Sequence, residues 1–351
     1  MEHSLARVRA VLRGEKPDRT PLYDLLRNDA VLSHFARETL TYENAREAVF
    51  RAYAPAVDAT RPKVRLPERE RSGVGANGRE FRQFRWTVWN AHVVYADSDA
   101  YASAKRKLLD AFDPAWTPAQ AEAMRAFLDD IADHRRQLGE VFFFPSMGSV
   151  GLMSIYGEVG LEAFSYYLAD CPDVVDAVIE METQKSIAWI EHLPEDHGIE
   201  AVFCGDDIAF KSGPLLAPAW FKKHYFPRCA RVCAAYHRRG IKVLFHSDGN
   251  LWPLLDGLVE AGIDGLNPLE VLAGMDPVEA HRRYPRLFLA GGIDVSQLLP
   301  HGKPQEVKDA VRRAIDGTGG RLMVGSSTEL HDEVPLENYL ALREAALEHR
   351  L

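Results

Sequence analysis

The stretch KVLFHSDGN at 242–250 brings together two side chains that transfer protons and bind metal ions, an imidazole and a carboxylate. Its apolar first half predicts a buried strand that runs into a polar turn. Residues two apart on a strand face the same side, so His246 and Asp248 point the same way if the strand persists. Gly249 and Asn250 then end the strand. We therefore expect both groups at the C-terminal end of one strand.

Most other apolar runs of the chain also end in acidic, amide or hydroxyl side chains. The candidates at these ends are Asp24, Asp58, Asp206, Asp207, Asn267, Glu270, Asp294, Ser326, Ser327 and Glu329. In barrels of parallel strands, catalytic groups sit at the C-terminal ends of the strands. Like charges gathered there raise one another's pKa unless a cation compensates. The pattern indicates a site for a metal ion, for protons, or for a cationic or neutral polar substrate.

Several of these groups also have a structural interpretation. Asp294 follows Gly-Gly-Ile and can cap the next helix. Asn267 precedes a proline and can shape a turn, and Ser326 can cap a helix or form a turn. One of Asp206 and Asp207 is expected to hold backbone N–H groups, which leaves the other free to act.

Eight apolar runs, mostly separated by helical segments, indicate the fold. The expected strands lie at 20–24, 54–62, 140–145, 201–204, 242–245, 263–268, 287–290 and 321–324. This alternation implies a parallel sheet, and eight units predict a (β/α)8 TIM barrel in a single domain over 1–351. A helical extension is expected at 4–13. An insertion is expected at about 63–138, with a β-hairpin at 81–97 and then helices, one of which starts at Thr117.

Composition narrows the class of protein. The chain has 351 residues, a net charge of -9 and 46% hydrophobic residues. The acidic balance argues against nonspecific binding to nucleic acid or to anionic membranes. No apolar run is long enough for a membrane span, and the N-terminal segment lacks the apolar core of a secretory signal. We expect a cytoplasmic protein whose four cysteines stay reduced.

A resemblance to a known family is carried by GDDIAFKSGPLLAPAWFKKHYFPR, KVLFHSDGNLWPLLDGLVEAGIDGLNPLE, LFLAGGID and PLENY. Together they resemble the uroporphyrinogen decarboxylase superfamily. They are closer to its methylcobamide:coenzyme M and related corrinoid-linked methyltransferases than to true uroporphyrinogen decarboxylases. The likeness is strong from about residue 200 onwards, and GLEAFSYYLADCPDVV at 160–175 fits a helical segment of the same family. The resemblance independently implies a barrel, and its members often form homodimers.

The chain departs from the motifs of both branches. True decarboxylases carry an arginine-rich N-terminal motif that grips substrate carboxylates, and here TPLYDLLRNDAVLSHF retains only Arg27. Thiol-directed methyltransferases bind zinc through a His-x-Cys pair and a later Cys, which fall on His246, Asp248 and near Ser326. Both soft ligands are missing, which argues against a thiolate acceptor. A His/Asp/Glu site suits zinc or a harder divalent ion that polarises a methyl ether or amine. Without a metal, the carboxylates would act as general acids and bases.

The first hypothesis is a methyltransferase that moves a methyl group between a small substrate and a corrinoid, carried on a partner protein. His246, Asp248 and Glu329 would hold a metal or protonate the leaving group, and Asp206 and Asp207 would orient the substrate. Further contacts to the substrate are expected from Asp24, Asp58, Asn267, Glu270, Asp294 and Ser326.

Two other hypotheses follow from the same residues. A decarboxylase or other lyase acting on a small acid or tetrapyrrole would need arginines at the mouth of the barrel, such as Arg27 or Arg61. A non-catalytic binding protein would keep the barrel without turnover, so that His246→Ala would alter affinity alone.

Overall fold

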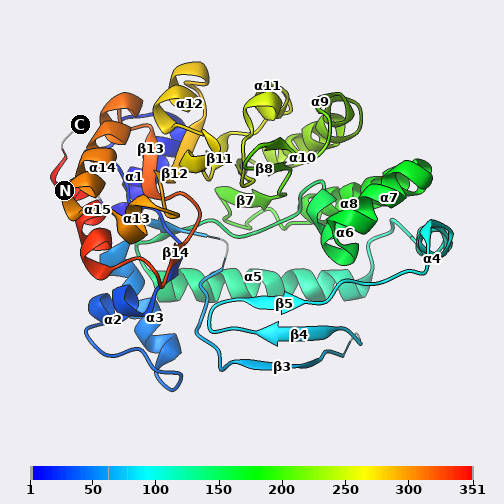
Figure 1. Cartoon of the computed structure of the whole chain (residues 1–351), viewed down its shortest axis with the longest axis horizontal. Helices are drawn as coiled ribbons and strands as arrows, with labels where there is room; N and C mark the ends of the chain where they lie inside the picture. The colour runs from blue at the N-terminus through cyan, green and yellow to red at the C-terminus, as the bar shows by residue number, and fades with distance from the viewer. Residues whose placement is uncertain (1–2, 62, 77, 350–351) are drawn as a thin grey trace.

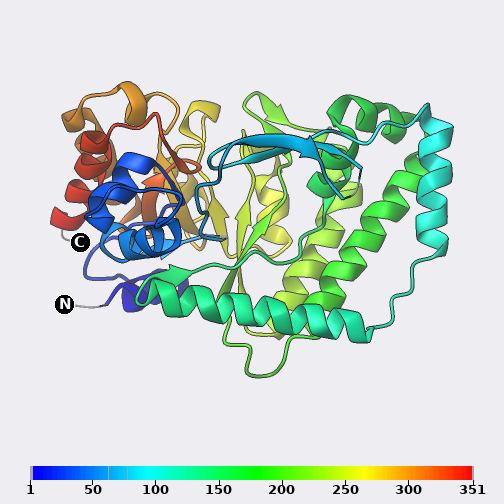
Figure 2. The ribbon, with the colours of Figure 1, turned by 90° about the horizontal axis from the view of Figure 1, so that it is seen from below.

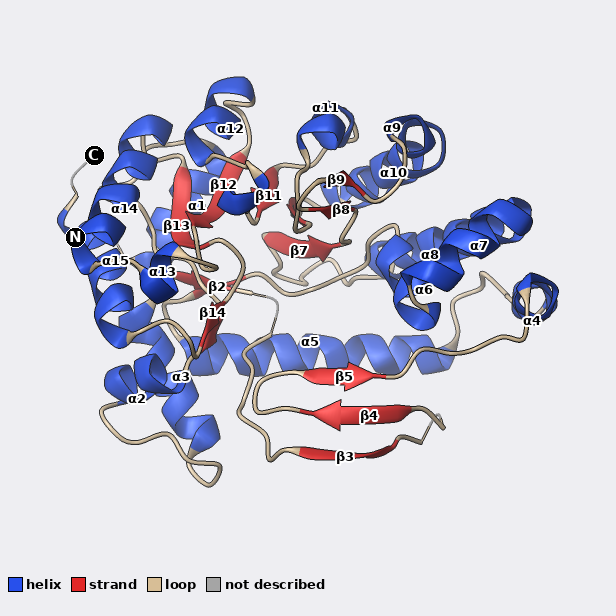
Figure 3. Ribbon diagram, in the orientation of Figure 1, coloured by secondary structure: helices blue, strands red, loops and turns tan. Residues whose placement is uncertain are grey.

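The computed structural model describes residues 3–61, 63–76 and 78–349. It is an α/β fold in which short parallel strands form the centre and helices surround them (Figures 1 and 3). Across these described ranges, every helix is too short or too polar to span a bilayer.

The largest group of central strands is a five-stranded parallel sheet. Its members are β7 (Ala201–Gly205), β10 (Lys242–His246), β11 (Gly265–Asn267), β12 (Phe288–Ile293) and β13 (Leu322–Ser326). They pair in the order β13-β12-β11-β10-β7, and every pairing is parallel. The C-terminal ends of all five strands therefore lie along the same edge of the sheet.

A second parallel pair, β2 (Ala59–Thr60) with β6 (Phe142–Phe143), connects to both edges of this sheet. The isolated parallel bridges that make the connection are Leu22 to Val324, Tyr23 to Ala59, and Ser146 to Phe203. The series of parallel pairings thus returns to β7, where it began.

The register of β10 decides which residues meet at the C-terminal side. His246 pairs with Gly205 of β7 on one side and with Asn267 of β11 on the other. Asp206 and Asp207 follow Gly205 directly, so the pairing brings them to the same height as His246.

Buried side chains lie in two clusters on opposite faces of the strands. Leu244 and Phe288 belong to an inner cluster that also contains Val8 of α1 (Ser4–Arg13). Val243 belongs to an outer cluster under the surrounding helices. Because both faces of each strand are covered, the strands read as continuous apolar runs.

The remaining elements surround the centre. The helices are α2 (Asp29–Ala36), α3 (Ala45–Ala56), α6 (Leu152–Val159), α7 (Leu161–Asp170), α8 (Pro172–Glu191), α9 (Pro218–Trp220), α10 (Phe226–Arg238), α11 (Trp252–Glu260), α12 (Pro277–Arg283), α13 (Leu298–His301), α14 (Pro304–Thr318) and α15 (Leu336–Glu348). Short helical turns lie at η1 (Phe221–Tyr225) and η2 (Val271–Ala273), and short strands at β1 (Leu26–Arg27), β8 (Ala209–Phe210), β9 (Gly213–Pro214) and β14 (Leu330–His331).

The insertion lies between β2 and β6, as expected. It contains β3 (Arg71–Val74), β4 (Glu80–Gln83), β5 (Val88–Asn90), α4 (Ser98–Asp110) and α5 (Pro118–Leu138). The expected hairpin is present as β4 and β5, and the charged segment before it adds β3 as a third antiparallel strand. Thr117 and Gln120 cap the start of α5 reciprocally, and this helix runs along one side of the molecule (Figure 2).

One expected strand, at 54–62, was placed wrongly, and the error moves a candidate residue. The alanine-rich sequence before it favours helix, so α3 continues to Ala56 and β2 begins only at Ala59. Asp58 therefore precedes the strand and lies at the end opposite to the expected site. There its carboxylate accepts hydrogen bonds from Arg19 and from the hydroxyl of Ser4 in α1. The expectation that Asp58 contacts a substrate at the mouth is wrong.

Candidate functional site

His246 ends β10 with one ring nitrogen fixed and the other directed at a carboxylate. Its Nδ1 lies 2.8 Å from Oδ1 of Asn267. The amide nitrogen of Asn267 donates to the carbonyl of Ala290, so its oxygen must face the imidazole, and Nδ1 carries the proton. Nε2 is then an acceptor, and it lies 3.7 Å from Oδ1 of Asp207. Burial, with the nearby Arg61, holds the pKa of His246 well below its ordinary value, which keeps the ring neutral.

Asp207 and Asp248 complete an acceptor cluster with His246. One ligand atom from each of the three residues lies within 4.8 Å of the others. Oδ1 of Asp248 is buried and has no hydrogen-bond partner among the residues that the structure describes. Burial raises the pKa of Asp207. Burial, with Asp207 and Glu270 nearby, raises the pKa of Asp248 to about 7.

The backbone N–H of Asp248 donates to Oδ1 of Asp207, but no side chain of the described residues donates to either carboxylate of the cluster. The three acceptors therefore repel one another unless a cation or a proton lies between them. A neutral imidazole and two carboxylates are also a common ligand set for zinc and for harder divalent ions. The residues present therefore fit a divalent metal, with Asn267 orienting the histidine ligand through its second nitrogen, as outer partners of metal ligands do.

Asp206 performs the structural role that one member of the Asp206-Asp207 pair was expected to take. Its carboxylate accepts hydrogen bonds from the backbone N–H groups of Gly151, Leu152 and Met153 at the start of α6, and from the Tyr225 hydroxyl. The residue is fully buried. Contrary to the expectation that it acts on a substrate, Asp206 anchors this helix to the end of β7.

Glu329 does not join the metal-binding atoms, contrary to the expected set of His246, Asp248 and Glu329. Its carboxylate forms an ion pair with Arg27, and Asp207 takes its place in the cluster. Glu329 still raises the pKa of Asp248 through its charge.

Arg61 brings a cation to this acidic site. It follows β2 directly, is only 5% exposed, and places its guanidinium 4.5 Å from the ring centre of Phe203. It donates to the carbonyl of Thr328, and its buried Nε has no partner within the described part of the chain. Among the site predictions Arg61 appeared only as a requirement of the lyase hypothesis. The carboxylates were identified because each follows an apolar run. Arg61 also follows such a run, so the same signal could have identified it.

The other candidates serve mainly to hold loops. Asp24 is buried and accepts from the backbone and hydroxyl of Ser326 and from the backbone of Leu25; burial raises its pKa to about 6. Asp294 accepts three backbone N–H groups at 296–298, where α13 begins. Glu270 accepts from the backbone of Gly249 beside the cluster. Asp24, Ser326 and Asp294 are therefore occupied by internal hydrogen bonds rather than directed at a free space.

Comparisons with known proteins agree with the motifs. The chain is similar to the methylcobamide:CoM methyltransferase MtbA of Methanosarcina mazei, with 24% identity over 182 residues, which cover 52% of each protein. It thus spans about half the length of this curated relative. It is also similar to the solved structure of a methyltransferase from Methanosarcina mazei, with a TM-score of 0.70, 20% identity and 99% of both chains covered. At that identity the likeness establishes the fold alone. The uroporphyrinogen decarboxylase (URO-D) family profile matches residues 146–349, which is more than half of the chain. The curated relative agrees with the predicted closeness to the methyltransferase branch, and the chain belongs to the uroporphyrinogen decarboxylase (URO-D) family.

Proposed function

We propose that the protein is a metal-assisted methyltransferase that moves a methyl group between a small substrate and a corrinoid carried on a partner protein. The observation that carries the metal site is the convergence of Nε2 of His246 with the carboxylates of Asp207 and Asp248, to which no side chain of the described residues donates a hydrogen bond. The methyl transfer is supported by the similarity to the methylcobamide:CoM methyltransferase MtbA.

The chain's own residues have distinct tasks in this proposal. His246 offers an oriented lone pair because Asn267 holds its other nitrogen. Without a cation, burial and the neighbouring carboxylates raise the pKa of Asp248 to about 7, and a divalent ion bound at the cluster would displace its proton. A divalent cation bound at the cluster would polarise the oxygen or nitrogen that bears the methyl group. Because the sulfur ligands of the thiol-directed enzymes are absent, an ether or amine substrate is favoured over a thiol.

The architecture that supports this site is, we infer, a (β/α)8 barrel in a single domain. The parallel pairings that return to β7 support the barrel, and the inner apolar cluster fills its centre. The homodimer and the cytoplasmic location stay predictions from the sequence and its resemblance.

Metal content tests the cluster. Purified protein exposed to zinc, manganese or cobalt should retain about one equivalent of a divalent ion after dialysis, by analogy with single-ion sites of this ligand set. His246→Ala should lose the ion, and His34→Ala, which removes an exposed histidine of α2, should keep it. Wild-type protein that retains none of these ions would exclude the metal site.

Methyl transfer is tested with reduced cob(I)alamin and a panel of methyl ethers, methylamines and methyl thioethers. With at least one donor, we expect the absorption of cob(I)alamin to change to that of the methylated form. The change should be slower with the Asp248→Asn variant than with the wild type. No change with any donor would refute it.

A second candidate function is a lyase that decarboxylates a small acid. The observation in its favour is the buried guanidinium of Arg61 beside the cluster, whose Nε forms no hydrogen bond with the described residues. Release of carbon dioxide from an added acid, lost in Arg61→Gln, would favour this candidate over methyl transfer.

A further inference from the structure

A cavity of about 550 Å³ lies under the insertion and apart from the acceptor cluster. Its walls come from β4 and β5, from α3 and α5, and from the segment at 63–68. Asp207, His246 and Asp248 do not line it. Its volume lies within the range of pockets that hold small organic molecules.

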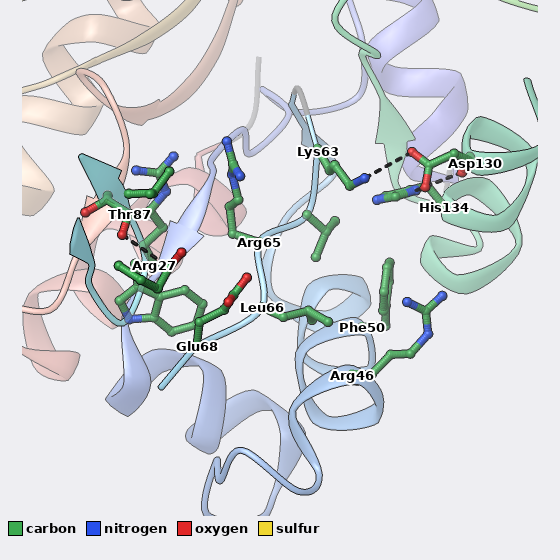
Figure 4. A pocket seen from close by; sticks show the side chains of 14 residues that line it. Arg27, Arg46, Phe50, Lys63, Arg65, Leu66, Glu68, Thr87, Asp130 and His134 are labelled. Atoms are coloured by element: carbon green, nitrogen blue, oxygen red, sulfur yellow. Dashed lines mark hydrogen bonds and ion pairs between the residues drawn. The ribbon is translucent and has the colours of Figure 1, made fainter. Parts of the chain in front are cut away.

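Basic side chains dominate the polar lining. Arg27, Arg46, Lys63 and Arg65 face two carboxylates, Glu68 and Asp130. Figure 4 shows Lys63 directed at Asp130 and His134 at one end of the cavity, with Arg27 and Arg65 toward the other end.

Arg65 is the cation available to a ligand. Arg46 pairs with Asp133, Lys63 with Asp130, and Arg27 with Glu329. Arg65 is exposed, and no hydrogen bond or ion pair joins it to any other described residue.

Arg27 reinforces the positive end. Its side chain is 14% exposed, and its buried Nε lacks a hydrogen-bond partner over the described ranges. Burial lowers the pKa of Arg27, and the charges of Arg65 and Arg61 lower it further, against the opposing effect of Glu329. The charges of Arg65 and Arg27 repel each other, so an anion bound between them would relieve that repulsion, whereas the lining carboxylate of Glu68, which forms no ion pair with a described residue, opposes it.

The rest of the wall is apolar. Phe50, Val64 and Trp86 are buried, and Leu66 is partly buried. The indole nitrogen of Trp86 is already bonded to Asp332, so its ring offers an apolar surface to the cavity. A flat or apolar body can pack on this wall while its anionic group meets the arginines.

We propose that this cavity binds an organic carboxylate with an apolar, ring-shaped body, whose carboxylate is held by Arg65 and Arg27. The site is separate from the acceptor cluster and does not depend on the methyltransferase proposal.

Calorimetric titration with naphthoate and with its neutral isostere naphthamide tests the site. Naphthoate should bind more tightly than naphthamide, and its affinity should fall as the ionic strength rises, because an exposed cation is screened. Arg65→Gln should weaken naphthoate binding by roughly five- to tenfold and leave naphthamide unchanged.

Arg82→Gln is the matched control, because Arg82 is an exposed arginine of β4 that does not line this cavity; it should bind naphthoate as the wild type does. His246→Ala should also bind as the wild type does. Equal affinity of wild type and Arg65→Gln, absence of naphthoate binding, or loss of binding in His246→Ala alone would each overturn the proposal.

Discussion

The largest predicted loss of stability concerns Asp206, because its single buried carboxylate accepts hydrogen bonds from four donors. It accepts three backbone N–H groups at the start of α6 and the Tyr225 hydroxyl. Asp206→Ala would leave these donors without their acceptor. Each buried unsatisfied donor costs about 1–3 kcal/mol, and partial hydration of the helix end offsets part of the sum, so we expect a loss of about 3–5 kcal/mol. This is a large share of the total stability of a typical domain.

The pH dependence of stability distinguishes the contribution of the charge of Asp206 from the contribution of its hydrogen bonds. Burial raises the pKa of Asp206 from 3.8 to about 6. The folded state therefore binds the proton more tightly than the unfolded chain, and the resulting stability is fully present below the unfolded pKa and is lost as the pH rises through about 6. Between about pH 7 and about pH 5, wild type should gain about 1 kcal/mol relative to Asp206→Asn, which has no proton to bind.

Guanidinium denaturation followed by circular dichroism measures both effects. Asp110→Asn serves as the control, because it neutralises an exposed aspartate at the end of α4 and should change stability by less than about 0.5 kcal/mol. A loss below about 1 kcal/mol in Asp206→Ala would refute the anchoring role. A stability difference between wild type and Asp206→Asn that stays constant with pH would refute the reasoning about the charge.

Three further predictions concern other parts of the chain. Asn267→Leu removes the acceptor that orients His246 and should lower divalent-metal affinity roughly ten- to hundredfold in a chelator competition assay; unchanged affinity would mean that the imidazole is held in place by its packing alone. Asp58→Ala leaves partly buried Arg19 without its bidentate carboxylate and should lower the free energy of unfolding by about 3–5 kcal/mol, measured by denaturation; a loss no larger than that of an exposed aspartate would contradict this. Thr117→Ala breaks the reciprocal cap of α5 and should cost about 1 kcal/mol, whereas Thr117→Ser should cost far less; equal losses in the two variants would exclude the cap.

The local sequence carried much of the fold and the centre of the site. Five of the apolar runs predicted the strands of the central parallel sheet, whereas the run at 20–24 forms only isolated bridges at Leu22 and Tyr23. His246 and Asp248 lie together as predicted, although β10 ends at His246 and Asp248 belongs to the loop after it. Thr117 signalled the start of α5 correctly. These features depend on residues close together in the chain. The repeat of the helix or strand fixes the directions in which the side chains of such residues point.

Tertiary structure decided which acidic groups stay available. Of two adjacent aspartates, Asp206 meets the start of α6, whereas Asp207 faces His246. Glu329 forms an ion pair with Arg27, a residue about 300 positions distant in the sequence, and does not join the acceptor cluster. Asp58 lies outside the site because α3 extends further than expected and β2 begins only after Asp58. For the same reason, Arg61 lies at the C-terminal end of β2. Local patterns determine which side chains reach the ends of strands, but the partners that neutralise, orient or free those side chains come from distant segments, because only the packed fold brings their charges within reach of one another.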